Sequence, residues 1–364
     1  MRNADAIHTV QELCATVQTR SDPREEEARQ AAHRQWASIA KPLDSLGLLE
    51  TAVEDIAALT LNHNIDISKR SLILLCADNG VVAQGVTQSD YTVTAAVARN
   101  AGQNRSSVCK MAQVANCRVV PVDMGMRDPG PIPGVLDRRI GNGTGDITQG
   151  PAMTREQAER AVLTGVSLVS ELRDQGVTLL ATGEMGIGNT TTSSAVASVL
   201  LGRPVQEMTG RGAGLSDQGL RRKLWAIETA IARNKPDPDD PLDVLAKVGG
   251  FDIAGMCGIF LGGALCRVPV LMDGFISTAA ALCALRLCPE SSRAMFASHV
   301  SAEPAGRLVL DALGKKPLIA AGMRLGEGTG AVAAIPLLDM ALSLYADGTT
   351  FDTTGIEAYT PQGG

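Results

Sequence analysis

The chain has 364 residues, and its 33 basic and 39 acidic side chains give a formal net charge of −6 with no basic block. This balance argues against a nucleic acid or an anionic membrane surface as the main partner, because both attract concentrated Lys and Arg. Hydrophobic residues make up 45% of the chain and aromatic residues only 3%, so we expect an aliphatic α/β core and a small-molecule ligand.

The first 20 residues alternate polar and apolar side chains without a charged-then-apolar leader, so we expect a cytoplasmic protein. Arg267 and Asp273 interrupt the apolar stretches between residues 258 and 287, so we expect a soluble chain with no membrane span there. The cysteines include no CxxC pair and mostly lie in apolar runs, which favours reduced core thiols over disulfides or a metal site. They are Cys14, Cys76, Cys109, Cys117, Cys257, Cys266, Cys283 and Cys288.

Residues 1 to about 65 predict helices, with a charged stretch at 22–29 and a break at 41–47. Apolar runs that end in Gly or Asp then alternate with helical patterns, which predicts βαβ units in a doubly wound, mostly parallel α/β sheet. Ligands of such a sheet bind beyond the carboxyl ends of its strands. The predicted strands cover residues 71–80, 117–125, 177–186, 268–275 and 316–330, and the helices 94–115, 154–175, 216–233, 252–266 and 302–313.

The run TGEMGIGNTTT, residues 182–192, joins the third of these strands to a helix. Its glycines let the backbone approach a ligand, and the polar residues after them supply hydroxyls, an amide and a helix N-cap. Free N–H groups and the positive end of the helix dipole suit a phosphate at this turn. Glu184 also lies in the turn, and because a carboxylate repels phosphate, we expect it to contact another part of the substrate.

The run GMRLGEGTGA, residues 322–331, holds one acid, Glu327, between Gly326 and Gly328. The flanking glycines leave room for a flat substrate beside the carboxylate, which makes Glu327 a candidate general base. The structural alternative is an acid that favours the helix dipole at the start of the following helix.

The run SHVSAEP, residues 298–304, brings His299, Ser301 and Glu303 together on a polar turn. We do not interpret this as a hydrolase site, because there is no GxSxG elbow and residues so close in sequence rarely form the catalytic relay. Ser301 either caps the next helix or contacts a ligand, and His299 is either a hydrogen-bonded structural residue or a ligand contact.

The run TGRGAGL, residues 209–215, has the glycines of a dinucleotide-binding motif, but it follows no clear strand and Arg211 interrupts it. The sequence therefore offers little support for a nicotinamide-dinucleotide oxidoreductase. No GxxxxGK[ST] motif appears either, which counts against ATP use.

Taken in order, these motifs resemble the nicotinate-nucleotide–dimethylbenzimidazole phosphoribosyltransferase family. The resembling segments include KPLDSLGLLE, ADNGVVAQGVT, TGEMGIGNTT, GRGAGL, GGFDIAGMCGIFLGGA, VPVLMDGFISTAAAL, SHVSAEPAGRLVLDALG and GMRLGEGTGA, which span most of the chain. The resemblance implies a large Rossmann-like α/β domain (66–334) and a small helical domain from both chain ends (1–65 and 335–364). It also implies a dimer in which the partner subunit completes the active site.

The resemblance further implies transfer of the 5-phosphoribosyl group of nicotinate mononucleotide to a lower-ligand base, with inversion and release of nicotinate, in cobamide assembly. Neither a metal nor a cofactor is expected, because the departing pyridinium nitrogen already carries the positive charge. Glu327 matches the catalytic glutamate, Glu184 a second acid of the pocket, and Lys223 a lysine near the nucleotide. The candidates for holding nicotinate mononucleotide are Gly186, Gly188, Asn189, Thr190, Ser301 and Arg324, although Arg324 has a salt bridge as its alternative.

The departures from the family pattern concern the incoming base. Asn79 stands in the position of a histidine, Tyr91 lies in a segment that usually contains proline, and Met185 follows Glu184. A bulkier and less polar pocket of this kind points to the subgroup that acts on phenol and p-cresol and works as two homologous subunits. On this interpretation the chain is the catalytic subunit of a heterodimer. One alternative is a homodimer that acts on 5,6-dimethylbenzimidazole. The other is a non-catalytic subunit that completes a partner's pocket.

Overall fold

The computed structural model describes residues 7–359, and its core is one sheet of six parallel strands in the order β3-β2-β1-β4-β5-β6. The strands are β1 (Arg70–Ala77), β2 (Cys117–Gly125), β3 (Leu136–Asp137), β4 (Leu179–Met185), β5 (Val270–Met272) and β6 (Met295–Ala297). This is the strand order of a doubly wound sheet, and its direction reverses between β1 and β4. The predicted α/β fold class is confirmed.

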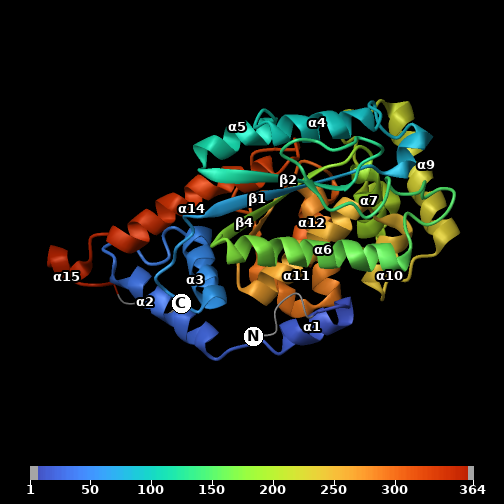
Figure 1. Cartoon of the computed structure of the whole chain (residues 1–364). Coiled ribbons are helices and arrows are strands. Elements are labelled where there is room, and N and C mark those ends of the chain that lie inside the picture. Colours follow the sequence, from blue (N-terminus) through green and yellow to red (C-terminus); the bar gives the residue numbers. More distant parts are fainter. Residues whose placement is uncertain (1–6, 360–364) are drawn as a thin grey trace.

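Helices cover both faces of the sheet (Figure 1). On one face lie α4 (Thr92–Gly102), α5 (Ser107–Val114) and α14 (Thr329–Asp347), and on the other α6 (Arg155–Asp174), α11 (Phe251–Cys266) and α12 (Phe275–Leu287). Gly165 and Gly258 let α6 and α11 touch backbone to backbone, since a Cβ at either would clash with a carbonyl of the other helix. The remaining helices are α1 (Val10–Gln18), α2 (Arg24–Ser38), α3 (Leu48–Thr60), α7 (Asn189–Leu201), α8 (Val205–Met208), α9 (Asp217–Asn234), α10 (Pro241–Val248), α13 (Ala305–Ala312) and α15 (Phe351–Thr354), with 3-10 turns η2 (Gly80–Gln84) and η3 (Pro289–Ala294).

Four of the five predicted strands exist, but the strand predicted over 316–330 is wrong. Gly322, Gly326 and Gly328 adopt positive φ angles there, so the segment turns repeatedly instead of extending. The sixth place in the sheet is taken by β6, which the sequence pattern missed. The helix predicted over 94–115 is two helices, because the chain turns after Gly102 and Asn104 adopts a left-handed conformation.

The helices before residue 65 occur where the sequence predicts them, and α2, α3 and α14 enclose a second apolar cluster apart from the main core. Its centre is an edge-on contact between Trp36 and Tyr345, whose ring centroids lie 5.0 Å apart. Both chain ends therefore pack together, but α14 runs continuously across the predicted boundary at residue 335. The division into two domains stays a prediction.

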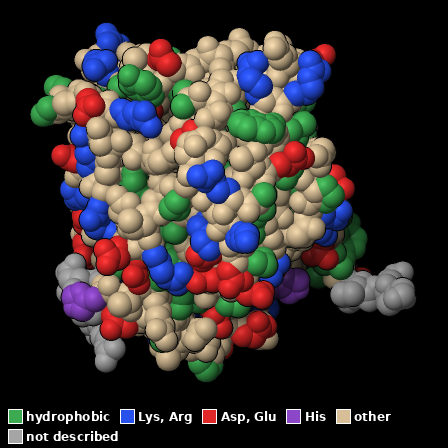
Figure 2. Space-filling model, turned by 90° about the vertical axis from the view of Figure 1, so that its right-hand side faces the viewer, with side chains coloured by type: hydrophobic (Ala, Val, Ile, Leu, Met, Phe, Trp, Pro, Cys, Tyr) green, Lys and Arg blue, Asp and Glu red, His purple; other side chains and the backbone are tan. Residues whose placement is uncertain are grey.

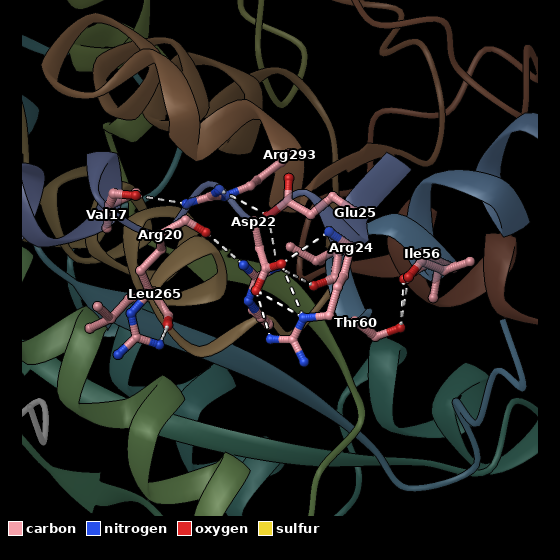
Figure 3. A network of polar contacts seen from close by, with 12 residues as sticks. Val17, Arg20, Asp22, Arg24, Glu25, Ile56, Thr60, Leu265 and Arg293 are labelled. Atoms are coloured by element: carbon pink, nitrogen blue, oxygen red, sulfur yellow. Dashed lines mark hydrogen bonds and ion pairs between the residues drawn. The ribbon is translucent and has the colours of Figure 1, made fainter. Parts of the chain in front are cut away.

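A network of hydrogen bonds and ion pairs links the segment around α1 and α2 to the α/β sheet region (Figure 3). Glu25 accepts hydrogen bonds from Arg267 at 2.8 Å and from Arg293 at 3.3 Å. Arg293 also donates to the carbonyl of Val17, and Arg20 donates to the carbonyl of Leu265. One carboxylate thus compensates two mostly buried guanidinium groups where four segments of the chain meet.

Glu25→Gln is expected to lower the free energy of unfolding by about 2 kcal/mol, between the values for exposed and buried ion pairs. The reason is that the substitution leaves Arg267 and Arg293 close together without the one carboxylate that contacts both. Urea unfolding of both proteins measures the difference. Glu26→Gln is the matched control, because Glu26 is exposed and its contact with Arg29 is long, at 3.9 Å. Equal unfolding midpoints for both variants would contradict the prediction.

Within residues 7–359, α14 alone has the length and apolar composition to cross a membrane, but half of that window is buried inside the protein. Core helices of soluble proteins share these properties, and Figure 2 shows basic and acidic side chains interspersed over one face of the molecule. The eight cysteines are free thiols, and six of them are buried.

Candidate active site

A cavity of about 340 Å³ lies beyond the carboxyl ends of the central strands, beside the point where the strand order reverses. Its walls come from the segments after β4, β5 and β6 and from the loop before α14. The structure brings together eight of the eleven predicted site residues here, namely Glu184, Met185, Gly186, Asn189, Thr190, Ser301, Arg324 and Glu327. Gly188, Lys223 and Tyr91 lie outside the cavity lining.

The turn after β4 points the amino end of α7 toward the cavity. The predicted cap residue is wrong, since Gly188 is the N-cap, at φ 93°, and no side chain caps the helix. Gly186 is required here, because a Cβ would lie 2.6 Å from the carbonyl oxygen of Ala77 and 2.7 Å from Asp252. Thr190 lines the cavity in the first turn of α7, so this wall combines a helix N-terminus with a hydroxyl.

Glu184 is a buried carboxyl at the end of β4. The side-chain amide of Asn189 donates both to Glu184 and, at 3.0 Å, to Asp252. Burial raises the pKa of Glu184 well above its usual range despite the hydrogen bond from Asn189, and Asp252, Asp273 and Glu327 raise it further. Burial also raises the pKa of Asp252 to about 6. Asn189 therefore holds two carboxyl groups that resist carrying two charges at neutral pH.

Glu327 lies opposite, just before α14, in a left-handed conformation with φ 59°. Its Oε2 accepts a hydrogen bond of 3.2 Å from the backbone N–H of Val108 in the first turn of α5. A Cβ at Gly183 would lie 2.5 Å from the carbonyl oxygen of Glu327, so the glycine of β4 lets this loop lie directly on the strand. Glu327 is thus fixed through both its side chain and its backbone, and it lies half-buried on the cavity wall.

Lys223 is fully buried on α9, behind the cavity wall. Its Nζ donates to Thr190 Oγ1 at 2.9 Å and to the carbonyl of Gly210 at 3.1 Å. Burial lowers its pKa to about 8, although the charge of Glu303 acts in the opposite direction. Lys223 therefore reaches the site through Thr190, which lines the cavity.

Two of the three residues that depart from the family pattern lie outside the cavity lining. Asn79 is buried behind it and accepts a hydrogen bond of 3.3 Å from Thr192. Tyr91 is 43% exposed, and the guanidinium of Arg127 lies over its ring, 5.6 Å from the ring centroid. Of the three residues that differ from the family pattern, Met185 is the one that lines the cavity.

The segment after β6 supplies Ser301, His299 and Glu303 to the cavity. Ser301 does not cap α13, whose N-cap is Pro304; its Oγ accepts instead from the backbone N–H of Glu303 at 3.3 Å. Arg324 forms no ion pair within the described part of the chain, so the salt-bridge alternative is not supported. Its exposed guanidinium stays free to contact a ligand.

Sequence reasoning missed several wall residues, above all Asp273 at the end of β5 and the pair Gly212 and Ala213. Asp273 could have been predicted, because it is an acid directly after a strand. In the sequence it stands out only as a charge that interrupts an apolar stretch. The glycine-rich run 209–215 lines the cavity without forming a nucleotide-binding βα turn, because it connects α8 to α9. Asp252 gave no signal of a site, since it lies in the first turn of α11, where the helix dipole alone explains an acid.

The comparisons with known proteins agree with this geometry. The sequence profile of a family described as phosphoribosyltransferase matches residues 21–356. The chain is 46% identical over 329 residues to the nicotinate-nucleotide–dimethylbenzimidazole phosphoribosyltransferase of Acetivibrio thermocellus, covering 90% of this chain and 94% of that protein. The enzyme of the same name from Escherichia coli K12 is 39% identical, with coverage of 94% and 92%. The crystal structure of CobT from Thermus thermophilus superposes with a TM-score of 0.86 at 39% identity, covering 91% and 99% of the two chains.

The doubly wound fold and the matched family profile define an enzyme of the phosphoribosyltransferase class. Within that class, the chain belongs to the nicotinate-nucleotide–dimethylbenzimidazole phosphoribosyltransferase family. The resemblance noted from the sequence motifs is confirmed.

Proposed function

We propose that this enzyme transfers the 5-phosphoribosyl group of nicotinate mononucleotide to an aromatic base or phenol, with inversion at C1′ and release of nicotinate, in cobamide assembly. The observation that carries the proposal is that Glu327, Glu184 and the amino end of α7 line the same cavity. The helix end and Lys223 suit the phosphate, and Glu327 suits removal of the proton from the incoming nucleophile. Ser301 and Arg324 are proposed further contacts of the nucleotide.

The charge of the cavity supports a cationic substrate ring. Glu184, Asp252, Asp273 and Glu327 lie in or directly behind its wall, and no Lys or Arg within residues 7–359 donates a hydrogen bond to any of them. Burial favours the neutral form of Glu184, and Arg324 also lines the cavity, so a pyridinium ring would offset the charge of the remaining carboxylates in the bound state. Because the pyridinium nitrogen becomes neutral when it leaves, no acid is required to protonate nicotinate.

The apolar part of the wall supports an aromatic nucleophile. It includes Val97, Met185, Ile187, Phe275, Ile276 and Leu325. We propose phenol or p-cresol as the acceptor, with 5,6-dimethylbenzimidazole as the alternative. The choice of a phenolic acceptor depends mainly on Met185, because Met185 lines the cavity whereas Asn79 and Tyr91 lie outside its lining.

We also propose a cytoplasmic dimer, with either a second copy or a homologous subunit as the partner, and two domains divided near residues 65 and 335. The outward face of α14 supports a partner, since it carries half-exposed or exposed apolar side chains at helical spacing. They are Ala333, Pro336, Leu337 and Met340, and Met340 is 60% exposed. Leu325, 58% exposed on the cavity wall, lies just before this helix, so a partner on this face would reach the site.

The proposed function is tested by incubating the purified chain with nicotinate mononucleotide and phenol, p-cresol or 5,6-dimethylbenzimidazole. Chromatography and mass spectrometry should show nicotinate and one α-ribotide phosphate in equal amounts, with a phenolic acceptor preferred. Light scattering of the same sample gives the oligomeric state. Nicotinate release that never exceeds the rate without protein would overturn the proposal.

The alternative is a non-catalytic subunit that completes the site of a homologous partner. The joint presence of Glu184, Lys223 and Glu327 favours catalysis by this chain itself. Activity of the purified chain alone decides between them, because an accessory subunit would release nicotinate only with its partner.

A further inference from the structure

Asp273 lies directly after β5 and is almost completely buried. Its Oδ1 accepts hydrogen bonds from the backbone N–H groups of Gly330 at 2.7 Å and Ala331 at 3.2 Å. Its Oδ2 accepts from Gly328 N–H at 3.1 Å. One carboxylate from another element therefore caps α14, whose own N-cap, Gly328, has no side chain to do so.

The capped turn holds the proposed catalytic base. Glu327 immediately precedes Gly328, and its left-handed backbone conformation is unfavourable for a residue with a side chain, so surrounding contacts must maintain it. Asp273 supplies three of these contacts, and Thr329 Oγ1 supplies another by donating to the carbonyl of Gly326 at 2.8 Å. The negative charge of Asp273 also lies at the positive end of α14.

Asp273 is itself fixed in place from the other side. Its backbone N–H donates to Ser277 Oγ at 3.2 Å and to Thr182 Oγ1 at 3.3 Å, and these two hydroxyls contact each other at 2.6 Å. The loop of Glu327 is thereby joined to β4 and α12. His299 Nδ1 lies 3.9 Å from Asp273 Oδ1 and forms an ion pair only when protonated, which its burial opposes by lowering its pKa.

We infer that Asp273 is a positioning residue, whose carboxylate fixes the 326–331 turn so that Glu327 points its own carboxylate at the incoming nucleophile. The inference rests on the proposed function, in which Glu327 is the base. Asp273 acts on backbone N–H groups, whereas a residue that contacts the substrate would leave its oxygens for the ligand. A displacement of the base by about 1 Å is sufficient to reduce the rate strongly.

The test is a double-mutant cycle on kcat with Asp273→Asn and Glu327→Gln. Asp273→Asn keeps the size of the side chain but removes the charge and turns an N–H₂ group toward a backbone donor. We expect a loss of about 30-fold in kcat, with the KM for nicotinate mononucleotide changed less than about threefold. In the Glu327→Gln background the same substitution should change kcat less than about threefold, because the group it positions is already absent.

Two further variants keep the test interpretable. Thr329→Val removes one bond of the same turn without altering the charge, so a smaller loss with the same non-additivity is expected even if Asp273→Asn folds poorly. Asp240→Asn is the matched control, because Asp240 caps α10 in the same manner by accepting from Leu242 N–H and Asp243 N–H. It should leave kcat unchanged.

Hydrogen exchange gives a readout that does not depend on the reaction. The amides of Gly328, Gly330 and Ala331 should exchange faster in Asp273→Asn while amides of the sheet stay protected. Losses that multiply in the double mutant, or a rise in KM as large as the fall in kcat, would overturn the inference. Failure of the wild type to release nicotinate would instead refute the proposed function.

Discussion

Glu327→Gln is expected to lower kcat for phosphoribosyl transfer by about 1,000-fold, the middle of the range for loss of a general base. Gln has the size of Glu and keeps an oxygen that can accept from Val108 N–H, so the loop should retain its position. What is lost is the ability to take the proton from the nucleophile. A phenol, with a pKa of about 10, stays almost fully protonated at neutral pH without such a base.

Steady-state kinetics with each acceptor measure this loss, and the KM for nicotinate mononucleotide should change much less than kcat, because other carboxyl groups of the wall remain beside the pyridinium ring. Glu207→Gln serves as the control, since Glu207 lies on α8 in a half-exposed pair with Arg203. A Glu327→Gln enzyme that keeps more than a tenth of the wild-type kcat would assign the proton transfer to another group, and Glu184 would be the next candidate.

The alternation of apolar runs and helical patterns was sufficient to predict the fold class, because β1, β2 and β4 are long and buried on both faces. The edge of the sheet was not predictable in the same way. Strand β6 has three residues and follows a 3-10 turn, so it presents no periodic signal. The segment 316–330 has the apolar and glycine pattern of a strand, but the glycines serve turns with positive φ.

For the site, sequence reasoning identified the groups that contact the cavity through their own turn. Glu184 and Glu327 fall in glycine-rich runs, where a lone acid is conspicuous. The supporting residues act across elements: Asp252 reaches Glu184 through Asn189, and Asp273 holds the loop of Glu327. Such pairings depend on which strands are neighbours, which the order β1-β4-β5 establishes only in three dimensions.

Lys223→Met is expected to raise the KM for nicotinate mononucleotide by about tenfold, because the buried charge acts on the phosphate from behind the wall, through Thr190. Lys223 donates to Thr190 and Gly210, so its loss removes both the charge and the hydrogen bond that orients the Thr190 hydroxyl in the cavity wall. Met keeps the apolar length of the side chain, so the fold of α9 should be maintained. Lys110→Met, which replaces an exposed lysine on α5, is the control and should behave as wild type.

The same group predicts a pH dependence that separates binding from folding. Because burial lowers the pKa of Lys223 to about 8, the free enzyme loses this positive charge as pH rises through 8, and kcat/KM for nicotinate mononucleotide should fall there. Folding responds with the opposite sign: between pH 8 and 10.5 the unfolded chain binds more protons at this lysine than the folded chain, so its contribution to stability increases with pH. A fall in kcat/KM above pH 8 therefore cannot come from unfolding driven by Lys223. The Lys223→Met enzyme should lose this limb of the profile, and a limb that persists unchanged in that variant would show that the titration of another group causes it.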